Sequence, residues 1–178
     1  MALLEMMAEV GATGGIGVLR CGTSLADVVA ALGPAEDLGG LDEPRQGSHR
    51  FSCGDVEFIV CRCRLVSTIS ISTWHDSPLD LPSPESHAVV SFPSRMTFQQ
   101  VTSALDAIGC RWWLDTRVPD TQRTVLTEPS AGTWSSFTFS TTDGGDGPVL
   151  DDPRLYKVNA WDVAHECATV PETLPHVG

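Results

Sequence analysis

The sequence predicts an α+β fold made of two tandem repeats, each a helix followed by an antiparallel sheet, related by pseudo-symmetry. Each half carries one segment with the apolar spacing and the capping residues of a short helix. Each segment is followed by short runs rich in β-branched and aromatic residues, which favour strands. A half of roughly 75 residues is marginal on its own, so we expect the halves to pack together or to share one sheet.

The first half begins with two short elements, a helix over residues 3–10 and a strand over residues 16–20. Its main helix follows, with Ser24 as the N-cap and Asp27 in the first turn, where it suits the helix dipole. Gly33-Pro34 ends this helix. Its apolar face is formed by residues at the spacing of one helix face: Leu25, Val28, Val29 and Leu32. We expect strands over residues 49–53, 55–61 and 65–72.

The second half repeats this pattern. Thr97 and Gln100 form a capping box, and Gly109 ends the helix. Its apolar face is formed by Phe98, Val101, Leu105 and Ile108, and the first three match Leu25, Val28 and Leu32 when Ser24 is aligned with Thr97. We expect strands over residues 111–115, 123–126, 134–140 and 154–161. The predicted organisation is a first repeat over 1–76, a Pro-rich linker over 77–90, and a second repeat with a C-terminal tail over 91–178.

Residues 22–34 read Gly-Thr-Ser-Leu-Ala-Asp-Val-Val-Ala-Ala-Leu-Gly-Pro. This phrase is similar to the opening of small bacterial outer-membrane-assembly lipoproteins and to immunity proteins of actinobacterial polymorphic toxin systems. The doubled helix-plus-meander unit resembles that of beta-lactamase inhibitory protein. The resemblance implies a compact α+β module that binds another protein and performs no chemistry. The lipoprotein role does not transfer, since the chain shows no lipobox or signal sequence, and the paired disulfide cysteines of the secreted inhibitor are missing.

The charge narrows the range of partners. The chain has 11 Lys and Arg against 23 Asp and Glu, a net charge of −12, and its cations are scattered along the sequence. This balance disfavours nucleic acid and anionic membranes and suits a basic protein partner. No stretch approaches the roughly 20 apolar residues of a membrane span. We therefore expect a cytoplasmic protein with reduced thiols, and its single lysine and its richness in Ala and Gly are typical of a high-GC actinobacterial genome.

The residues expected to bind the partner are aromatic and acidic. Consecutive tryptophans on a strand place one ring on each face, and an exposed ring would be an interface anchor, although the other repeat could cover both. The acidic residues lie in the loop after the first helix and in the Gly/Asp-rich loop 141–153, where a solvated acidic loop is favoured over a Ca²⁺ site. The predicted set is Trp112, Trp113, Trp134, Asp143, Asp146, Asp151, Asp152, Glu36 and Asp37.

Three patterns suggest chemistry without establishing it. Residues 11–17 look like the glycine-rich loop of short-chain dehydrogenases, but they follow a helix, so a flexible loop is favoured. Fragments such as His165-Glu166-Cys167 and Trp74-His75-Asp76 contain catalytic residue types whose adjacent side chains diverge. The metal-like set comprises Cys53, Cys61, Cys63 and His75. Cys-x-Cys within a strand suits zinc poorly, because zinc ligands usually sit on a turn, so buried thiols are favoured and a metal is left open.

The leading functional prediction is a cytoplasmic protein-binding module of the immunity or inhibitor type. It would neutralise a basic, toxin-like partner by occlusion, without a cofactor or metal. The alternative is a small enzyme or ligand-binding protein with a Cys/His-lined pocket between the repeats. A deep cavity with His75 or His165 within hydrogen-bond reach of a cysteine or carboxylate would favour that alternative. A third possibility is a metal-stabilised structural domain. The oligomeric state and the identity of the partner stay open.

Overall fold

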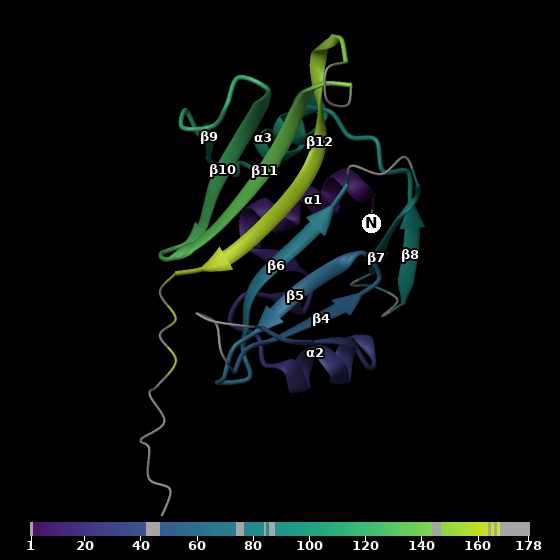
Figure 1. Ribbon diagram of the computed structural model, residues 1–178, viewed down its shortest axis with the longest axis vertical. Helices are drawn as coiled ribbons and strands as arrows, with labels where there is room; N and C mark the ends of the chain where they lie inside the picture. Colours follow the sequence, from purple (N-terminus) through teal and green to yellow (C-terminus); the bar gives the residue numbers. More distant parts are fainter. Residues whose placement is uncertain are drawn as a thin grey trace, which may run out of the picture.

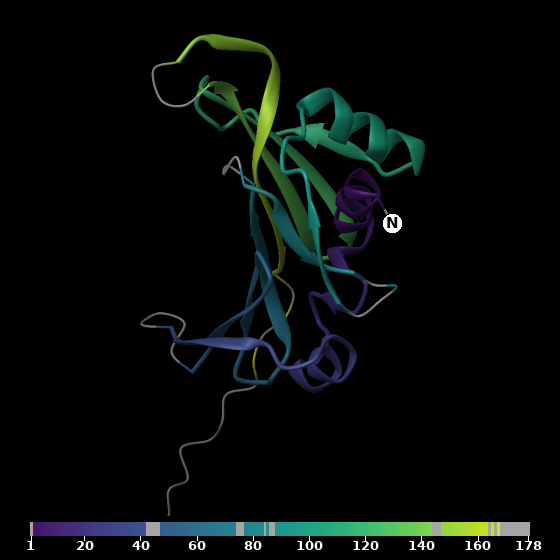
Figure 2. The same ribbon diagram turned by 90° about the vertical axis from the view of Figure 1, so that its right-hand side faces the viewer.

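A computed structural model describes residues 2–41, 47–73, 77–83, 85, 88–143, 147–163, 165 and 167. Its centre is one eight-stranded antiparallel sheet in the order β3-β4-β5-β6-β12-β11-β10-β9. Helices α1 (Leu3–Thr13), α2 (Leu25–Leu32) and α3 (Phe98–Ala107) lie on one side of this sheet, as Figures 1 and 2 show. The α+β prediction is confirmed. Among the described residues, no helix is long and apolar enough to cross a membrane.

The strands of the large sheet form two meanders. The first comprises β3 (Glu36–Gly40), β4 (His49–Cys53), β5 (Val56–Val60) and β6 (Val66–Ser72), and the second comprises β9 (Trp112–Leu114), β10 (Gln122–Ser130), β11 (Thr133–Thr142) and β12 (Val149–Asp162). The last strands of the two meanders, β6 and β12, pair antiparallel and join them into one sheet. Since α2 precedes the first meander and α3 the second, the order of elements is the expected one. A symmetry that relates the two halves stays a prediction.

Both helix starts follow from their capping residues. The Ser24 side chain accepts a hydrogen bond from the Asp27 amide at 3.1 Å, and Thr97 and Gln100 form the expected capping box. Each N-cap residue also forms a β-bridge at the last strand of its own meander, Ser24 to Leu65, the residue before β6, and Thr97 to Arg154 in β12. These bridges fix each helix against the sheet. Ile108 is the C-cap of α3 and is 52% exposed, so its expected place on the apolar face is wrong.

Two expectations for connecting segments need correction. The loop expected after the first helix contains the edge strand β3, which pairs with β4 although Glu-Asp-Leu-Gly-Gly has little intrinsic preference for a strand. The Pro-rich linker folds into β7 (Leu79–Pro82), which pairs with β8 (Val89–Phe92). Leu79 and Leu81 are buried, and the backbone of Asp80 exchanges hydrogen bonds with Asp55, each at 2.7 Å. The linker is therefore part of the packed structure.

The glycine-rich segment is ordered, so the expected flexible loop is wrong. Gly11 lies inside α1, Gly14 ends that helix in the left-handed region at φ 77°, and the chain then forms a hairpin of β1 (Gly15–Ile16) and β2 (Leu19–Arg20). A phosphate-binding loop needs the amide end of a helix. Gly14, Gly15 and Gly17 instead follow the carbonyl end of α1, where the helix dipole is negative, so the dehydrogenase-like geometry is not formed.

The core lies between the sheet and the helices. Strand residues that face this side are almost fully buried, among them Phe58, Ile69, Ile71, Phe137, Phe139 and Val158. Helix α1 is also held by two buried hydroxyls of the sheet: Thr127 donates to the Gly11 carbonyl at 2.8 Å, and Ser135 donates to the Val10 carbonyl at 2.9 Å. The core continues across both meanders, so the two halves share one hydrophobic interior.

Candidate functional site

The second face of the eight-stranded sheet is open. In Figure 2 the helices lie on one side of the sheet only, and no helix of the described chain covers the other side. Strand alternation puts every second residue on this open face. Trp134 neighbours Ser135, which bonds to α1, so Trp134 points away from the helices. By cross-strand pairing, Trp161 lies beside it on β12.

Three tryptophans form a row on this open face. Trp113 on β9 meets Trp134 on β11 across β10, with ring centroids 5.6 Å apart in an edge-to-face arrangement. Trp161 continues the row on β12 through its pairing with Trp134. Trp113 is 40% exposed, a large area for an indole ring. The expectation that consecutive tryptophans face opposite sides therefore holds, and one of them is exposed on the open face.

Trp112, the other member of the consecutive pair, lies on the covered side. Its indole N–H donates to Asp106 at the end of α3 at 2.8 Å, and its ring meets Phe98 edge-on at 6.3 Å. Trp112 is therefore a packing residue of α3 and does not belong to the open face.

The acidic residues expected to bind the partner do not form one patch. Glu36 and Asp37 lie on β3, whereas Asp143, Asp151 and Asp152 lie where β11 leads into β12. Figure 1 shows this connection at the opposite end of the long axis from β4, the neighbour of β3. Asp146 lies outside the described residues.

Several of these carboxylates are already engaged. Asp143 pairs with Arg154 at 2.8 Å, and Asp152 accepts a hydrogen bond from the Gln99 amide in the first turn of α3. Asp37 lies 3.6 Å from a ring nitrogen of His49. They therefore contribute to the overall negative charge without forming a single docking surface.

A hollow of about 670 Å³ opens on the same face, at the seam between the two meanders. Its walls come from β5, β6, β11, β12 and the segment that follows β12. The lining residues are small, polar or sulfur-bearing for the most part: Ser48, Ile59, Cys61, Ser67, Thr68, Ser136, Asn159, Trp161, Asp162, Val163, His165 and Cys167. The tryptophan row therefore leads from the sheet edge at β9 to the rim of this hollow.

The pairing of β6 with β12 brings a Cys/His cluster together at the end of the hollow. Trp161 pairs with Thr68, and each step forward along β12 is a step back along β6. Four residues after Trp161 is His165, and four residues before Thr68 is Arg64, which lies in the turn between β5 and β6. The segment that follows β12 thus meets this turn, which carries Cys61 and Cys63. His165 and Cys167 arrive beside them, and the ligand atoms of all four side chains lie within 4.8 Å of one another.

The two cysteines of the turn are held by its backbone. The Cys61 amide donates to the Leu65 carbonyl at 2.9 Å, and the Arg64 amide donates to the Cys61 carbonyl at 2.9 Å. Arg64 has φ 64°, in the left-handed region that a tight turn requires. Cys61 is buried and Cys63 is exposed. The expectation that Cys61-x-Cys63 lies within a strand is therefore wrong, because β5 ends at Val60 and both cysteines belong to the turn.

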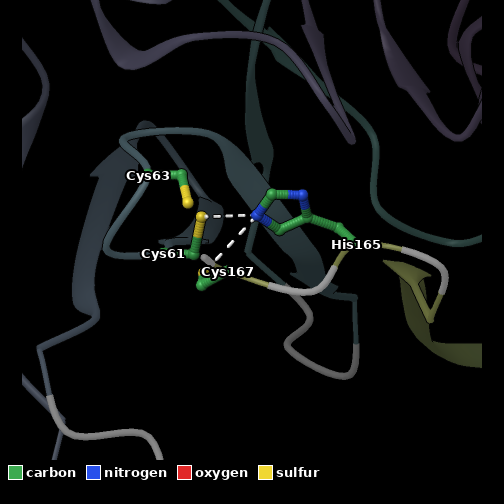
Figure 3. A group of neighbouring side chains, drawn as sticks. All are labelled: Cys61, Cys63, His165 and Cys167. Atoms are coloured by element: carbon green, nitrogen blue, oxygen red, sulfur yellow. Dashed lines mark hydrogen bonds between the residues drawn. The ribbon is translucent and has the colours of Figure 1, made fainter. Parts of the chain in front are cut away.

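Figure 3 shows the four side chains converging. The Nε2 atom of His165 lies 3.3 Å from the Cys61 sulfur and 3.4 Å from the Cys167 sulfur. Cys63 approaches from the other side of Cys61. Three sulfurs and one imidazole nitrogen thus point toward a common centre.

The thiols of this cluster differ in acidity. Burial raises the pKa of Cys167, but hydrogen bonds from the Cys63 amide and from the side chains of Cys61, Cys63 and His165 outweigh burial and lower this pKa to about 6. Burial and the contact with Cys167 raise the pKa of Cys61. The pair thus favours a Cys167 thiolate that accepts a hydrogen bond from a Cys61 thiol. Burial raises the pKa of Cys21, Cys53 and Cys110, which lie outside the cluster.

The sequence identified only half of this cluster. Cys53 ends β4 and is not among the four converging residues, and His75 lies outside the described residues. In the sequence, His165 and Cys167 stand out only as part of a fragment with catalytic residue types, and its middle residue Glu166 also lies outside the described residues. The repeated spacing could have indicated the cluster, because Cys61-x-Cys63 and His165-x-Cys167 each place two possible metal ligands two residues apart.

The chain matches no protein-family model, no curated protein and no solved structure.

Proposed function

We propose that the protein is a protein-binding module of the immunity or inhibitor type. It neutralises a basic protein partner by covering the partner's active site with the open face of its sheet. The observation that carries this proposal is the row of Trp113, Trp134 and Trp161 on a sheet face that no described helix covers. The proposal includes a cytoplasmic location, where the six free cysteines would stay reduced.

The tryptophan row is suited to a partner because exposed aromatic rings dominate the binding energy of protein interfaces. Tryptophan is enriched among the few residues that each contribute about 2 kcal/mol or more. An edge-to-face pair such as Trp113 and Trp134 holds both rings in place before binding, so less rotamer entropy is lost on association. The face beside the row, with Ser136, Asn159 and Thr68, supplies polar groups for the rim.

The charge favours a basic partner. The net charge of −12 produces a negative field that accelerates association with a cation-rich surface and repels nucleic acid and other acidic proteins. The open face itself is mixed, with Glu57 on β5 and Lys157 on β12 turned toward it. We therefore assign steering to the whole protein and affinity to the tryptophans.

The test uses the basic proteins encoded beside this gene as purified candidates, with an acidic neighbour product as a negative probe. The affinity of each candidate for the immobilised protein is measured at low and at high salt. We expect one basic candidate to bind tightly, with an association rate that falls as salt rises. Trp113→Ala and Trp134→Ala should each weaken the complex about 30-fold, the equivalent of about 2 kcal/mol.

Ile108→Ala is the matched control for these two variants. Ile108 is an exposed apolar residue at the end of α3, on the covered side of the sheet, so its truncation should leave the affinity unchanged. Absence of binding to every basic candidate at low salt would contradict the proposal. If the Trp113 and Ile108 variants weakened binding equally, the open face would not be the binding surface.

A second candidate function rests on the hollow. His165 lies within hydrogen-bond reach of two thiols at its end, and this geometry supports a small enzyme or ligand-binding protein with a Cys/His-lined pocket. Cys167 would be the nucleophile and His165 its base. A panel of thioester and peptide substrates tests this candidate: turnover that is lost in Cys167→Ser and kept in Cys110→Ser would favour it over the binding module.

A further inference from the structure

We propose that Cys61, Cys63, His165 and Cys167 bind one Zn²⁺ ion in a tetrahedral site that joins the end of β12 to the turn between β5 and β6. This inference goes beyond the proposed protein-binding function and does not depend on it. It rests on the convergence of four ligand atoms from two segments that are 104 residues apart in the sequence.

The spacing of the ligand atoms fits zinc. With Zn–S of about 2.3 Å and Zn–N of about 2.05 Å, tetrahedral angles place a sulfur and a nitrogen about 3.5 Å apart. The observed separations from His165 Nε2 are 3.3 Å to the Cys61 sulfur and 3.4 Å to the Cys167 sulfur. Two sulfurs in such a site lie about 3.8 Å apart, and all four ligand atoms lie within 4.8 Å of one another. These separations are compatible with four ligands on one ion.

The turn between β5 and β6 presents both of its cysteines to the cluster. The Cys61 amide donates to the Leu65 carbonyl and the Arg64 amide to the Cys61 carbonyl, each at 2.9 Å, and Arg64 has φ 64°. Backbone contacts of this kind orient metal ligands before the ion binds. The turn between β5 and β6 thus holds its two cysteines on one side, as a metal-binding turn must.

The donor set identifies the ion and its role. Three thiolates and one imidazole are the ligands of structural zinc sites, whereas Mg²⁺ and Ca²⁺ require oxygen. Four protein ligands complete the tetrahedron and leave no position for water or substrate. Three thiolates and Zn²⁺ carry one net negative charge, and the same turn contains two arginines, Arg62 and Arg64. The site is therefore structural, and a bound ion would leave Cys167 without nucleophilic character.

The ion would act at the hollow and at the tryptophan row. The end of β12 and the segment after it contribute Asp162, Val163 and His165 to the walls of the hollow. Trp161, at the end of the row, lies only four residues before His165. Tying this segment to the turn between β5 and β6 would fix the rim of the open face. We therefore expect removal of the metal to loosen the end of β12 more than the distant β3–β4 edge.

The first test measures metal content directly. The full chain is purified under reducing conditions with a tag that contains no histidine, and its zinc is quantified by elemental mass spectrometry. We expect one zinc per chain in the wild type and loss of most of it in Cys63→Ser and Cys167→Ser. Cys63 is exposed, so its replacement leaves the core packing intact. Cys53→Ser and Cys110→Ser are the matched controls, since both remove a half-buried thiol outside the cluster, and they should retain zinc.

The second test identifies the ligands by spectroscopy. Replacement of zinc by Co²⁺ should give the intense visible bands of a tetrahedral ion and a sulfur-to-metal charge-transfer band, both weakened in Cys63→Ser and His165→Ala. A chelator should lower the Tm of the wild type and leave that of Cys63→Ser unchanged. Absence of zinc after addition of Zn²⁺, equal zinc in wild type and variants, an octahedral Co²⁺ spectrum, or a Cys61–Cys167 disulfide in the protein as purified would each overturn the proposal.

Discussion

Two buried hydroxyls that hold α1 on the sheet should contribute unequally to stability. Thr127 and Ser135 are cross-strand partners, both fully buried, and they donate to adjacent carbonyls in α1. The Val10 carbonyl also accepts the Gly14 amide at 2.9 Å. The Gly11 carbonyl lies in the last turn, where helix carbonyls lack amide partners, and Thr127 is its donor among the described residues. Removal of the Thr127 hydroxyl therefore leaves a buried acceptor without a partner.

The magnitude follows from this difference. Thr127→Val keeps the shape of the side chain, loses one hydrogen bond and leaves an unsatisfied carbonyl, which costs about 2 kcal/mol. Ser135→Ala loses one bond from a carbonyl that keeps another, which costs about 1 kcal/mol. For a chain of this length, 2 kcal/mol lowers the Tm by about 4–8 °C.

Urea unfolding followed by tryptophan fluorescence measures both free energies, and unchanged m-values would show that the unfolded states are comparable. Thr124→Val on the same strand is the control. Thr124 is also buried, but its hydroxyl donates to the half-buried Thr138 hydroxyl at 3.4 Å, a long bond whose loss leaves no buried carbonyl without a partner, so the cost should be about 0.5 kcal/mol. A larger cost for Ser135→Ala than for Thr127→Val, or equal costs for the two threonine variants, would refute the reasoning.

Three further predictions follow from single contacts. Gly11→Ala would place a Cβ 2.4 Å from the Leu105 side chain, so it should destabilise the fold by about 1–3 kcal/mol in urea unfolding, and a neutral effect would contradict the close packing of α1 and α3. Ser24→Ala removes the N-cap of α2 and should cost about 1 kcal/mol by thermal unfolding, whereas an unchanged Tm would show that the cap contributes nothing. In chelator-treated protein, the alkylation rate of Cys167 should rise as the pH increases through about 6, because the reactive thiolate predominates above the pKa. Burial raises the pKa of Cys110, so Cys110 should react slowly over the same range. Peptide mass spectrometry measures both rates, and a common pH dependence would count against the thiolate.

Local signals predicted the helices and most strands. The caps at Ser24 and Thr97 work through contacts within three residues, so the sequence contains all that is needed to place them. The strand expected over residues 49–53 is β4 with the same bounds, since Phe51 is buried and its neighbours alternate with it. The edge strand β3 was missed because pairing with β4, and not its own composition, makes it a strand.

The candidate site was harder to predict because its parts meet only through the sheet. The residues of the turn between β5 and β6 look like a continuation of the strand when read by their period of two. Its charged neighbours Arg62 and Arg64, placed between two apolar runs, were the sign of a turn. No local rule relates that turn to a segment more than 100 residues away. The convergence of His165 with Cys61 requires knowledge that β6 pairs with β12.

The register of β6 against β12 therefore determines both surfaces proposed here. It pairs Trp161 with Thr68 and puts both on the open face, and by extension it carries His165 to the turn that holds Cys61 and Cys63. A slip of one residue along β12 would turn both Trp161 and Asn159 toward the helix-covered side of the sheet, because side chains alternate between faces. It would also move His165 away from both sulfurs. A metal at the Cys/His cluster would be compatible with one register only, so the ion and the tryptophan row depend on the same pairing. Loss of the metal and loss of partner affinity should consequently be linked in variants of the cluster, and not in Cys53→Ser or Cys110→Ser.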